Sequence, residues 1–373
     1  MKQVVCLSTS NFYPFPTRKQ NIMTRLSDAD ILYFDPPVSL LAPLKDRSSF
    51  NRLFAYRKEP SLAQDNLLVY SLPPVLPFFN KYRWINKLNQ WHLARFVRKK
   101  MKKHGFDQPY LWCYSPTSCD IVDRIPHREL IYDCVDRHSA YKGMINPSVV
   151  DKQEQDLAGK CDYVFCTAQG LYETLKQYNE QTFLIPNGAA YELFSQAAVE
   201  APASQQAVFG FVGMLQDCIA YDYIAALAKA YPDARIELIG KKLPDVDLSE
   251  IENLPNIYLR GLLPQKELPA VMKDFNVCLN LFSAGRLSKD VSPLKFYEYL
   301  ATGKPLVSTR EPLQVSDYAE MVYIADSIPE FLECCKKALE ENDPLLREKR
   351  MQAGKAASWS NRVEQMEKIL SWR

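Results

Sequence analysis

The sequence lacks the long apolar runs that membrane-spanning helices need. No stretch of the 373 residues contains eighteen consecutive apolar side chains, and the amino-terminal apolar run is too short for a signal sequence. An excess of charge of one sign is also absent, since the net charge is +2 with 24% charged residues. The chain as a whole is therefore no polyelectrolyte, and any basic behaviour must be local.

Several chemical motifs are missing as well. No G-x-G-x-x-G follows a predicted strand, which disfavours a dehydrogenase, and no G-x-x-x-x-G-K-[ST] marks a phosphate-binding loop. There is no H-E-x-x-H and no Cys/His cluster at metal-ligand spacing, so no metal site is predicted. The ten cysteines include no C-x-x-C pair and lie mostly in apolar runs. This usage indicates buried thiols in a reducing cytoplasm rather than a disulfide scaffold.

What the sequence does contain is a series of short apolar, β-branched runs separated by helical-looking segments. Continuous apolar strands that alternate with helices are typical of a parallel sheet covered on both faces. The predicted strands are 4–8, 31–37, 67–73, 110–115, 130–136, 163–168, 183–188, 207–213, 235–240, 257–261, 277–282, 305–309 and 321–326.

The chain divides into two such patterns. A small, polar, proline-containing stretch at 195–206 is typical of a linker, and the strand pattern restarts after it. We therefore predict an α/β protein of two Rossmann-like, doubly wound domains, 1–194 and 207–355, followed by an amphipathic helix within 356–373. Open α/β sheets bind ligands at the carboxyl ends of their strands, so a central cleft faced by both domains is the expected site.

One stretch, SPLKFYEYLATGKPLVST (292–309), predicts a helix followed by a strand. Ser292 is a good N-cap, and Pro293 suits the first helical position, where its missing N–H costs nothing. Gly303 fits the position after the last turn. The helix is thus predicted to begin at Pro293 and to end just before Gly303.

The amino-terminal turn of this helix carries a cation where a capping box would carry an acid. Lys295 stands at the predicted third helical position, and a cation is locally unfavourable beside the positive end of a helix dipole. A bound phosphate would explain it, and Glu298, one turn deeper, would then accept hydrogen bonds from a diol. The alternative is an ordinary amphipathic helix with an i,i+3 Lys/Glu pair.

Further candidate groups follow several strands of the second predicted domain. Glycine after the first strand lets backbone approach a diphosphate, although a tight strand-to-helix turn explains it equally well. Each group alone is weak evidence, and their recurrence after successive strands is the signal. They are Gly213, Lys241, Arg260 and Phe282.

The first predicted domain offers a candidate general base. The segment IYDCVDRHSAYKG (131–143) places Asp133, Asp136 and His138 at the carboxyl end of a strand. A carboxylate there could remove a proton from an acceptor hydroxyl, which contributes about 10²- to 10⁴-fold in rate. The alternative is that either aspartate caps a helix or stabilises a turn.

The segment 72–104 combines exposed-looking apolar groups with a basic stretch. Residues 81–104 hold nine Lys or Arg, interleaved with aromatics, and no Asp or Glu. Such a stretch predicts either contact with anionic lipid or a solvated basic face. Trp84, Leu88 and Trp91 fall opposite Leu93 and Val97 on a helix, which predicts a helix that is broken or packed on two sides. Nucleic acid is disfavoured because no recognised binding motif occurs.

Taken together, these motifs resemble glycosyltransferases of the two-domain GT-B fold, in the broad group around family 4. The likeness is greatest to bacterial cell-surface polysaccharide enzymes of the teichuronic-acid or exopolysaccharide type. It covers most of the chain, and the order of its motifs is more specific than any one of them. The motifs are RKQNIMTRL, IYDCVD, CDYVFCTAQGLYE, IPNGAAYELF, GFVGM, ELIG, IYLRGLLPQKELPAVMKDFNVCLNLF, SPLKFYEYLATGKPLVST and SWSNRVEQM.

The resemblance implies a role for each matching residue. Lys295 would pair with the phosphates of the donor and Glu298 with its ribose hydroxyls, while the first domain would bind the acceptor. Asp136 is the first choice for the base and Asp133 the second, with His138 beside them. The closing helix would cross back to the first domain. The implied donor-binding set is Gly213, Met214, Lys241, Arg260, Phe282, Asp290, Ser292, Pro293, Leu294, Lys295 and Glu298.

Two departures from the family leave the stereochemical outcome open. Many members carry Glu-x7-Glu, whereas the earlier acid here is Asp290, eight residues before Glu298. Many also carry a basic residue soon after the glycine loop, where this chain has Gln216 and Asp217. An aspartate base at 136 would suit inversion of the anomeric configuration.

The sequence therefore predicts a metal-independent, cytoplasmic glycosyltransferase without a cofactor, peripheral on the inner face of the plasma membrane if the basic segment binds lipid. It would move a sugar from a nucleotide diphosphate donor, a UDP-sugar, to a glycan or lipid-linked acceptor in cell-surface polysaccharide synthesis. One alternative on the same fold is a nucleotide-sugar 2-epimerase. Another is a two-domain solute-binding protein, which would be expected to have an export signal and few cysteines.

Overall fold

The computed structural model describes residues 1–141, 143–199, 206–244, 246–285 and 288–372. Half of the predicted linker, residues 200–205, lies outside the described residues. Internal contacts divide the chain into two units. The first comprises Met1–Pro186 together with Gln365–Arg373, and the second comprises Asn187–Glu364.

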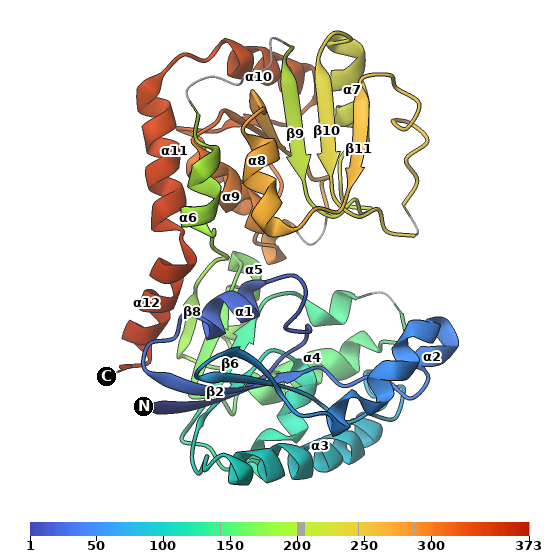
Figure 1. Cartoon of the computed structure of the whole chain (residues 1–373), viewed down its shortest axis with the longest axis vertical. Coiled ribbons are helices and arrows are strands. Elements are labelled where there is room, and N and C mark those ends of the chain that lie inside the picture. The colour runs from blue at the N-terminus through green and yellow to red at the C-terminus, as the bar shows by residue number, and fades with distance from the viewer. Residues whose placement is uncertain (142, 200–205, 245, 286–287, 373) are drawn as a thin grey trace. The chain divides into compact units, whose positions relative to one another are not determined.

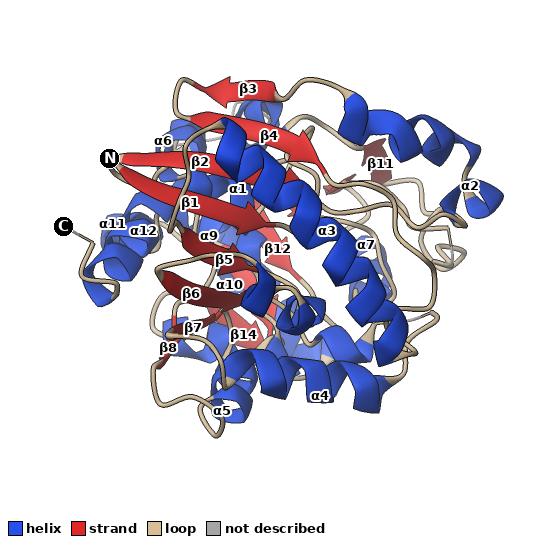
Figure 2. Ribbon diagram, turned by 90° about the horizontal axis from the view of Figure 1, so that it is seen from below, coloured by secondary structure: helices blue, strands red, loops and turns tan. Residues whose placement is uncertain are grey.

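The first unit is built on an eight-stranded sheet in the order β3-β4-β2-β1-β5-β6-β7-β8, counted over the described residues. All neighbouring strands are parallel except the edge pair β3 and β4. Figure 2 shows the strands in this order, with α3 lying across one face of the sheet. The strands are β1 (Lys2–Leu7), β2 (Ala29–Asp35), β3 (Ser61–Gln64), β4 (Leu67–Ser71), β5 (Tyr110–Cys113), β6 (Glu129–Cys134), β7 (Tyr163–Cys166) and β8 (Thr182–Leu184).

Helices cover both faces of this sheet, as parallel sheets require. Leu93, Val97 and Met101 on α3 are buried in the same apolar cluster as the strand residues Val5 and Leu111. The helices of the first unit are α1 (Arg18–Met23), α2 (Ala42–Lys45), α3 (Arg83–Lys103), α4 (Pro147–Ala158) and α5 (Gln169–Leu175).

The second unit contains a six-stranded sheet in the order β11-β10-β9-β12-β13-β14, again counted over the described residues. All of its neighbours are parallel, and β9, β10 and β11 run side by side in Figure 1. The strands are β9 (Val208–Val212), β10 (Arg235–Ile239), β11 (Ile257–Gly261), β12 (Val277–Asn280), β13 (Leu306–Thr309) and β14 (Tyr323–Ala325).

Two apolar clusters bury the two faces of this second sheet. Ile224 and Phe331 lie in one cluster, and Met272 and Leu300 lie in the other. The helices of this unit are α6 (Tyr191–Phe194), α7 (Tyr221–Ala230), α8 (Leu268–Met272), α9 (Leu294–Thr302), α10 (Ile328–Glu340), α11 (Pro344–Ala356) and α12 (Trp359–Ile369), the last of which ends within the first unit.

The predicted fold class and strands are confirmed. Each predicted strand overlaps an observed one, and the sequence pattern misses only β3 among the described strands. That strand is a short, mostly exposed, antiparallel edge, so it carries no continuous apolar run to signal it.

The boundary between the units differs from the predicted one. Residues 187–194, which the sequence assigns to the first domain, contact the second unit instead. Ala189 N–H donates to Ala357 O at 2.9 Å, and Phe194 is fully buried in a cluster of the second unit. At the other end of the chain, Trp372 Nε1 donates to Ser27 O at 2.8 Å within the first unit. Tertiary contacts of this kind have no local sequence signal.

The ten cysteines are thiols, and all except the half-buried Cys218 are buried, as the sequence predicts. Among the described residues, no helix is both long enough and apolar enough to cross a membrane.

Candidate functional site

The helix α9 supplies the groups predicted to bind a donor, but its start is shifted from the predicted one. The helix begins at Leu294, Pro293 occupies the capping position, and no side chain caps the helix. Lys295 is therefore its second residue rather than its third. The predicted N-cap, Ser292, is wrong, because its hydroxyl accepts a hydrogen bond from Asn187 N–H at 3.0 Å instead. The predicted end at Gly303 is confirmed by its φ of 71°.

Lys295 and Glu298 contact each other directly. Lys295 Nζ lies 2.6 Å from Glu298 Oε2, and Gln265 Nε2 donates to Glu298 Oε1 at 3.0 Å. Glu298 is fully buried, and burial raises the pKa of its carboxyl while Lys295 and Gln265 act in the opposite direction. The i,i+3 pair that the sequence left as an alternative is thus present. A ligand at Lys295 would have to compete with Glu298 for the ammonium group.

Hydrogen bonds fix α9 against the carboxyl end of β9. Val212 N–H donates to the hydroxyl of Tyr299 at 2.6 Å, and that hydroxyl donates to Val212 O at 3.2 Å. Because Gly213 follows Val212 directly, the loop after β9 begins beside the buried face of α9. The donor residues predicted on these two elements are brought together.

Neighbouring loops join this platform through backbone contacts. Leu215 N–H donates to Lys241 O at 3.0 Å, and the residues around Ile219 and Phe282 form an antiparallel bridge. A Cβ added to Gly240 would lie 1.7 Å from the carbonyl oxygen of Gly213, so only glycine permits this approach. The ends of β9, β10 and β12 therefore form one surface, on which the Lys241 side chain is exposed.

The remaining donor candidates differ in exposure. Asp290 is buried in the turn before α9, and Pro293 is buried beside it. Leu294 is half-buried, whereas the Met214 side chain is 40% exposed. Asn187 also reaches Ser292, because its Nδ2 donates to Ser292 O at 2.8 Å.

Arg260 does not join this group. It lies within the edge strand β11, where its Nε is 3.4 Å from Glu237 Oε2 on the neighbouring strand β10. Arg235 pairs with the same glutamate and lies over the Tyr258 ring. The Arg260 guanidinium therefore belongs to an ion cluster along the strands, and its role in donor binding stays a prediction.

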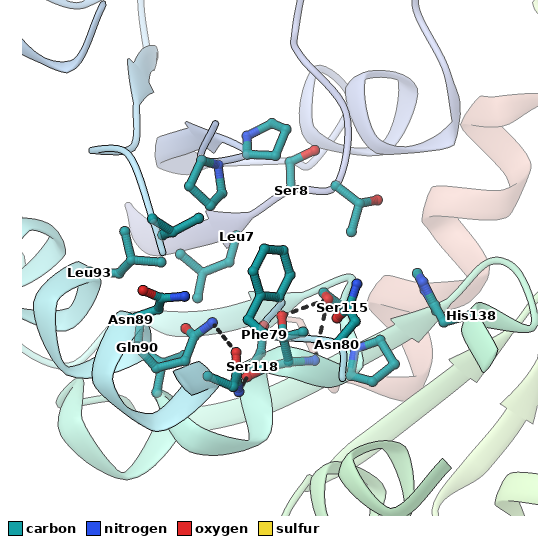
Figure 3. Close-up of a pocket in the computed structure, with 18 of the residues that line it drawn as sticks. Leu7, Ser8, Phe79, Asn80, Asn89, Gln90, Leu93, Ser115, Ser118 and His138 are labelled. Carbon is teal, nitrogen blue, oxygen red and sulfur yellow. Dashed lines mark hydrogen bonds between the residues drawn. The ribbon is translucent and has the colours of Figure 1, made fainter. Parts of the chain in front are cut away.

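The first unit contains a cavity of about 390 Å³ at the carboxyl ends of its strands. Its walls come from residues that follow β1, β2, β4, β5 and β6 and from one face of α3, as expected for an open α/β sheet. Figure 3 shows Leu93, Asn89 and Gln90 on one side of the cavity and His138 on the other, with Phe79 between them. Asp136, Lys19 and Tyr141 also line it.

Asp136, the predicted base, is half-buried in this cavity. The Tyr141 hydroxyl donates to its Oδ2 at 2.8 Å. Burial raises the pKa of the Asp136 carboxyl, and the Tyr141 hydrogen bond and nearby Lys19 oppose that rise. A carboxylate with a raised pKa is a stronger base than an ordinary aspartate, which suits removal of a hydroxyl proton.

Lys19, on α1, is a buried cation that the sequence analysis did not select. Its side chain is 8% exposed, its Nζ lies 5.4 Å from the centroid of the Tyr114 ring, and it forms no ion pair within the described residues. Burial lowers the pKa of the Lys19 ammonium, while Asp136 and Asp133 raise it.

His138 is 8% exposed, and its Nε2 has no hydrogen-bond partner among the described residues. Burial, with a smaller effect of Lys19, lowers the pKa of its imidazole to about 4. The ring packs edge-on against Tyr141 at 5.3 Å between centroids. His138 is therefore neutral near pH 7, and it lines the same cavity as Asp136 and Tyr141.

Asp133 is not available as a base. Its carboxylate is fully buried, and Arg18 Nε donates to both of its oxygens, at 3.0 and 2.9 Å. Arg18 also donates to Pro186 O at 3.0 Å, just after the end of β8. The ion pair therefore connects α1, β6 and the segment that follows β8. The second choice for the base is thus corrected to a structural ion pair.

Comparisons with known proteins match the chain to glycosyltransferases. Residues 222–368 match the family described as "Glycosyl transferase-like". Over 255 residues the chain is 27% identical to the Bacillus subtilis (strain 168) protein named "Putative teichuronic acid biosynthesis glycosyltransferase TuaH". That match spans 62% of this chain and 64% of the length of the relative.

Solved structures match over the whole length of the chain. Sucrose-phosphate synthase from Thermosynechococcus elongatus has a TM-score of 0.73 at 14% identity and covers 100% of this chain and 99% of its own. Anabaena HepE in complex with UDP has a TM-score of 0.65 at 14% identity and covers 100% of both chains. The chain has the GT-B glycosyltransferase fold. The predicted resemblance is confirmed for the fold, and residues 222–368 match a glycosyltransferase family model.

Several site residues of this GT-B protein escaped the sequence analysis. Gln265 and Asn187 lie in motifs that carried the resemblance, but their contacts join segments far apart in the chain. Lys19 lies in the RKQNIM segment, where a run of polar residues before a buried strand was the available signal.

The outer face of α3 combines exposed apolar side chains with a row of cations. The helix is continuous over 21 residues, which corrects the prediction of a broken helix or one packed on two sides. Trp84, Leu88 and Trp91 are 63%, 50% and 45% exposed, whereas the side chains on the opposite face are buried. Four cations without an ion-pair partner in the described residues line a groove along the second half of the helix: Arg95, Arg98, Lys99 and Lys102.

Proposed function

We propose that this protein transfers a sugar from a nucleotide diphosphate donor, a UDP-sugar, to a glycan or lipid-linked acceptor in cell-surface polysaccharide synthesis. The observation that carries the proposal is the Lys295–Glu298 pair in the first two turns of α9, fixed beside the glycine loop after β9. The name of the Bacillus subtilis relative and the UDP complex of Anabaena HepE support the choice of substrates.

In the donor site, Lys295 and the N–H groups that begin α9 bind the diphosphate. Those N–H groups have no intrahelical acceptors, and the helix dipole favours an anion there. When Lys295 turns toward the phosphates, Glu298 is released to accept hydrogen bonds from the ribose hydroxyls. Gln265 then holds the carboxylate in place through its 3.0 Å bond.

In the acceptor site, Asp136 removes the proton from the attacking hydroxyl, which favours inversion at the anomeric carbon. Tyr141 orients the carboxylate through its 2.8 Å hydrogen bond, and Lys19 stabilises the ionised form through charge. Interactions that strengthen as the nucleophile forms lower the barrier rather than merely binding substrate.

Neither a metal nor a cofactor enters this proposal. The leaving diphosphate gains negative charge as the glycosidic bond breaks, and preorganised donors aimed at it stabilise that charge. Lys295 and the α9 amides supply those donors.

The decisive experiment is thermal-shift screening of the purified chain against a panel of nucleotide sugars and free nucleotides. We expect UDP and at least one UDP-sugar to raise the melting temperature, because a ligand that binds only the folded state stabilises it by mass action. A control panel of sugars without a nucleotide should give no comparable shift from the donor site. A chain that no nucleoside diphosphate stabilises would contradict the proposal.

The outer face of α3 is the proposed contact with an anionic membrane, which would make the protein peripheral on the cytoplasmic face. Aromatic and leucine side chains occupy its first half, and the four cations of the groove occupy its second half. Each cation near an anionic lipid surface contributes about 1 kcal/mol, and the apolar groups enter the interface.

Liposome co-sedimentation tests this contact. Replacing Arg95, Arg98, Lys99 and Lys102 with Gln should reduce binding to anionic vesicles by at least about tenfold. Lys103→Gln is the matched control, since Lys103 pairs with Glu59 at 3.2 Å. Equal binding by the quadruple variant and the wild-type chain would contradict the proposed contact between α3 and the membrane.

A further inference from the structure

The cavity in the first unit is polar at one end and apolar at the other. Lys19, Asp136 and His138 gather at one end, and Lys19 Nζ and His138 Nε2 have no hydrogen-bond partner among the described residues. Phe79 separates this end from Leu93, as Figure 3 shows for Phe79, His138 and Leu93. The apolar wall residues of the cavity include Leu7, Leu72, Val75, Phe79, Leu93 and Ile121.

The amides near the apolar end are already bonded within the protein. Asn89 Nδ2 donates to Leu76 O at 3.0 Å, and its Oδ1 accepts from Leu76 N–H at 2.9 Å. Asn86 Nδ2 donates to Thr117 O at 2.9 Å, and its Oδ1 accepts from Gln90 Nε2 at 3.2 Å. A sugar buried there would lose its water without gaining equivalent hydrogen bonds, which is costly. An apolar group has no such cost.

The apolar wall continues outward to the surface. Segments 36–41 and 72–79 pair through backbone hydrogen bonds, Leu40 N–H to Val75 O and Val75 N–H to Val38 O, both at 3.0 Å. The inner residues of these segments line the cavity, while Leu40, Leu41, Leu76 and Phe78 are exposed. A chain leaving the cavity along this wall would therefore contact apolar side chains.

We infer that the acceptor is an amphiphile, in which a hydrocarbon chain occupies the apolar end of this cavity while the reacting sugar lies at Asp136. This inference rests on the proposed function, and it chooses a lipid-linked acceptor over a free glycan. The polar end receives the sugar hydroxyl, and the paired wall segments lead the rest of the chain outward. Each buried methylene should strengthen binding about fourfold, the equivalent of about 0.8 kcal/mol.

Binding of two glucosides to the full chain without nucleotide tests the inference. The probes are n-octyl β-D-glucoside, kept below its critical micelle concentration, and methyl β-D-glucoside, with affinities from calorimetry. Four buried methylenes predict that the octyl compound binds about two-hundredfold more tightly. Equal affinities would overturn the inference.

Two variants locate the chain within the cavity. Val75→Phe places a larger side chain in the apolar end, and Phe79→Ser removes part of the wall at a half-buried position that tolerates change better. Each variant should lower the affinity for octyl glucoside by at least about tenfold. Leu62→Asn, at an exposed leucine of β3 outside the cavity, should leave the affinity unchanged. Octyl affinity that is insensitive to both cavity variants would place the chain elsewhere and overturn the inference.

A parallel titration with UDP separates this inference from the proposed function. If the chain binds UDP and shows no preference for the octyl compound, the proposed function stands and the amphiphilic acceptor is contradicted. A chain that prefers the octyl compound and binds no nucleotide supports the cavity assignment and contradicts the function.

Discussion

The two units treat a lysine and a carboxylate in opposite ways. In the second unit Lys295 and Glu298 form a direct pair at 2.6 Å, and the lysine is 30% exposed. In the first unit Lys19 is buried near Asp136, yet it forms no ion pair within the described residues. A direct pair satisfies both charges and must open for a ligand, whereas a buried cation kept apart from its carboxylate leaves both groups ready for one.

This contrast suggests different roles for the two units, with ligand binding in the second and proton transfer in the first. The paired site suits a ligand with strong charge of its own, since a diphosphate can replace a carboxylate at Lys295. In the first unit, Asp136 remains without a direct ion pair within the described residues and burial raises the pKa of its carboxyl, which suits proton removal. Four changes would break or sharpen the comparison.

The largest effect is expected for Asp136→Asn. Removing the base should lower the transfer rate by about 10²- to 10⁴-fold, while the affinity for UDP stays unchanged. Initial rates and calorimetric titration of UDP measure the two quantities. The matched control is Asp65→Asn, at an exposed turn between β3 and β4. Near-normal turnover of the Asp136→Asn variant would show that another group is the base. The first unit would then not be the site of proton removal.

The pKa of His138 tests whether water enters the cavity of the first unit. Its pKa is lowered to about 4, so between about pH 6.5 and pH 4 the unfolded chain binds a proton that the folded chain does not. The free energy of unfolding is therefore not reduced by His138 above pH 6.5. As the pH falls toward 4, protonation of His138 in the unfolded chain lowers this free energy, on the order of 3 kcal/mol in total. Urea unfolding at pH 7.5 and pH 5 should show a smaller loss for His138→Gln.

The control for this experiment is His92→Gln, an exposed side chain on α3. It should lose as much stability as the wild-type chain on acidification. If His138→Gln and His92→Gln behave alike, His138 is hydrated and the contrast between the sites weakens.

Lys295→Ala tests the paired site. Loss of charge-assisted hydrogen bonds to phosphate should raise the dissociation constant for UDP by about tenfold to a hundredfold, measured by calorimetry. The variant also leaves Glu298 buried without its cation, so the melting temperature should fall. Combining Lys295→Met with Glu298→Gln should restore the melting temperature without restoring UDP affinity. Lys337→Ala, which removes the cation of an exposed pair with Glu333, is the control. Unchanged UDP affinity would mean that the pair is only structural.

The smallest effect is expected for chelation. Because Lys295 and the amides of α9 stabilise the leaving diphosphate in the proposal, EDTA should leave the transfer rate unchanged. Rates with EDTA and with added Mg²⁺ measure this. A large loss that Mg²⁺ restores would assign the role of Lys295 to a metal.

The strand pattern and the end of α9 were predictable because their signals are local. Apolar runs located the parallel strands along the chain, and Gly303 adopts the positive φ that ends the helix. The start of α9 was not predictable to the residue. Ser292 has the right chemistry for a cap, but Asn187, 105 residues away, takes its hydroxyl as an acceptor.

The sequence alone determined the two-sheet architecture, the position of Lys295 and Glu298 on one helix, and Asp136 at the end of a strand. Each follows from a periodicity or a spacing within a few residues. Tertiary structure alone decided that Asp133 pairs with Arg18, 115 residues away, and that Lys19 lines the same cavity as Asp136. A carboxylate becomes a base or a structural ion pair through the partner that folding brings to it, and no local pattern encodes that partner.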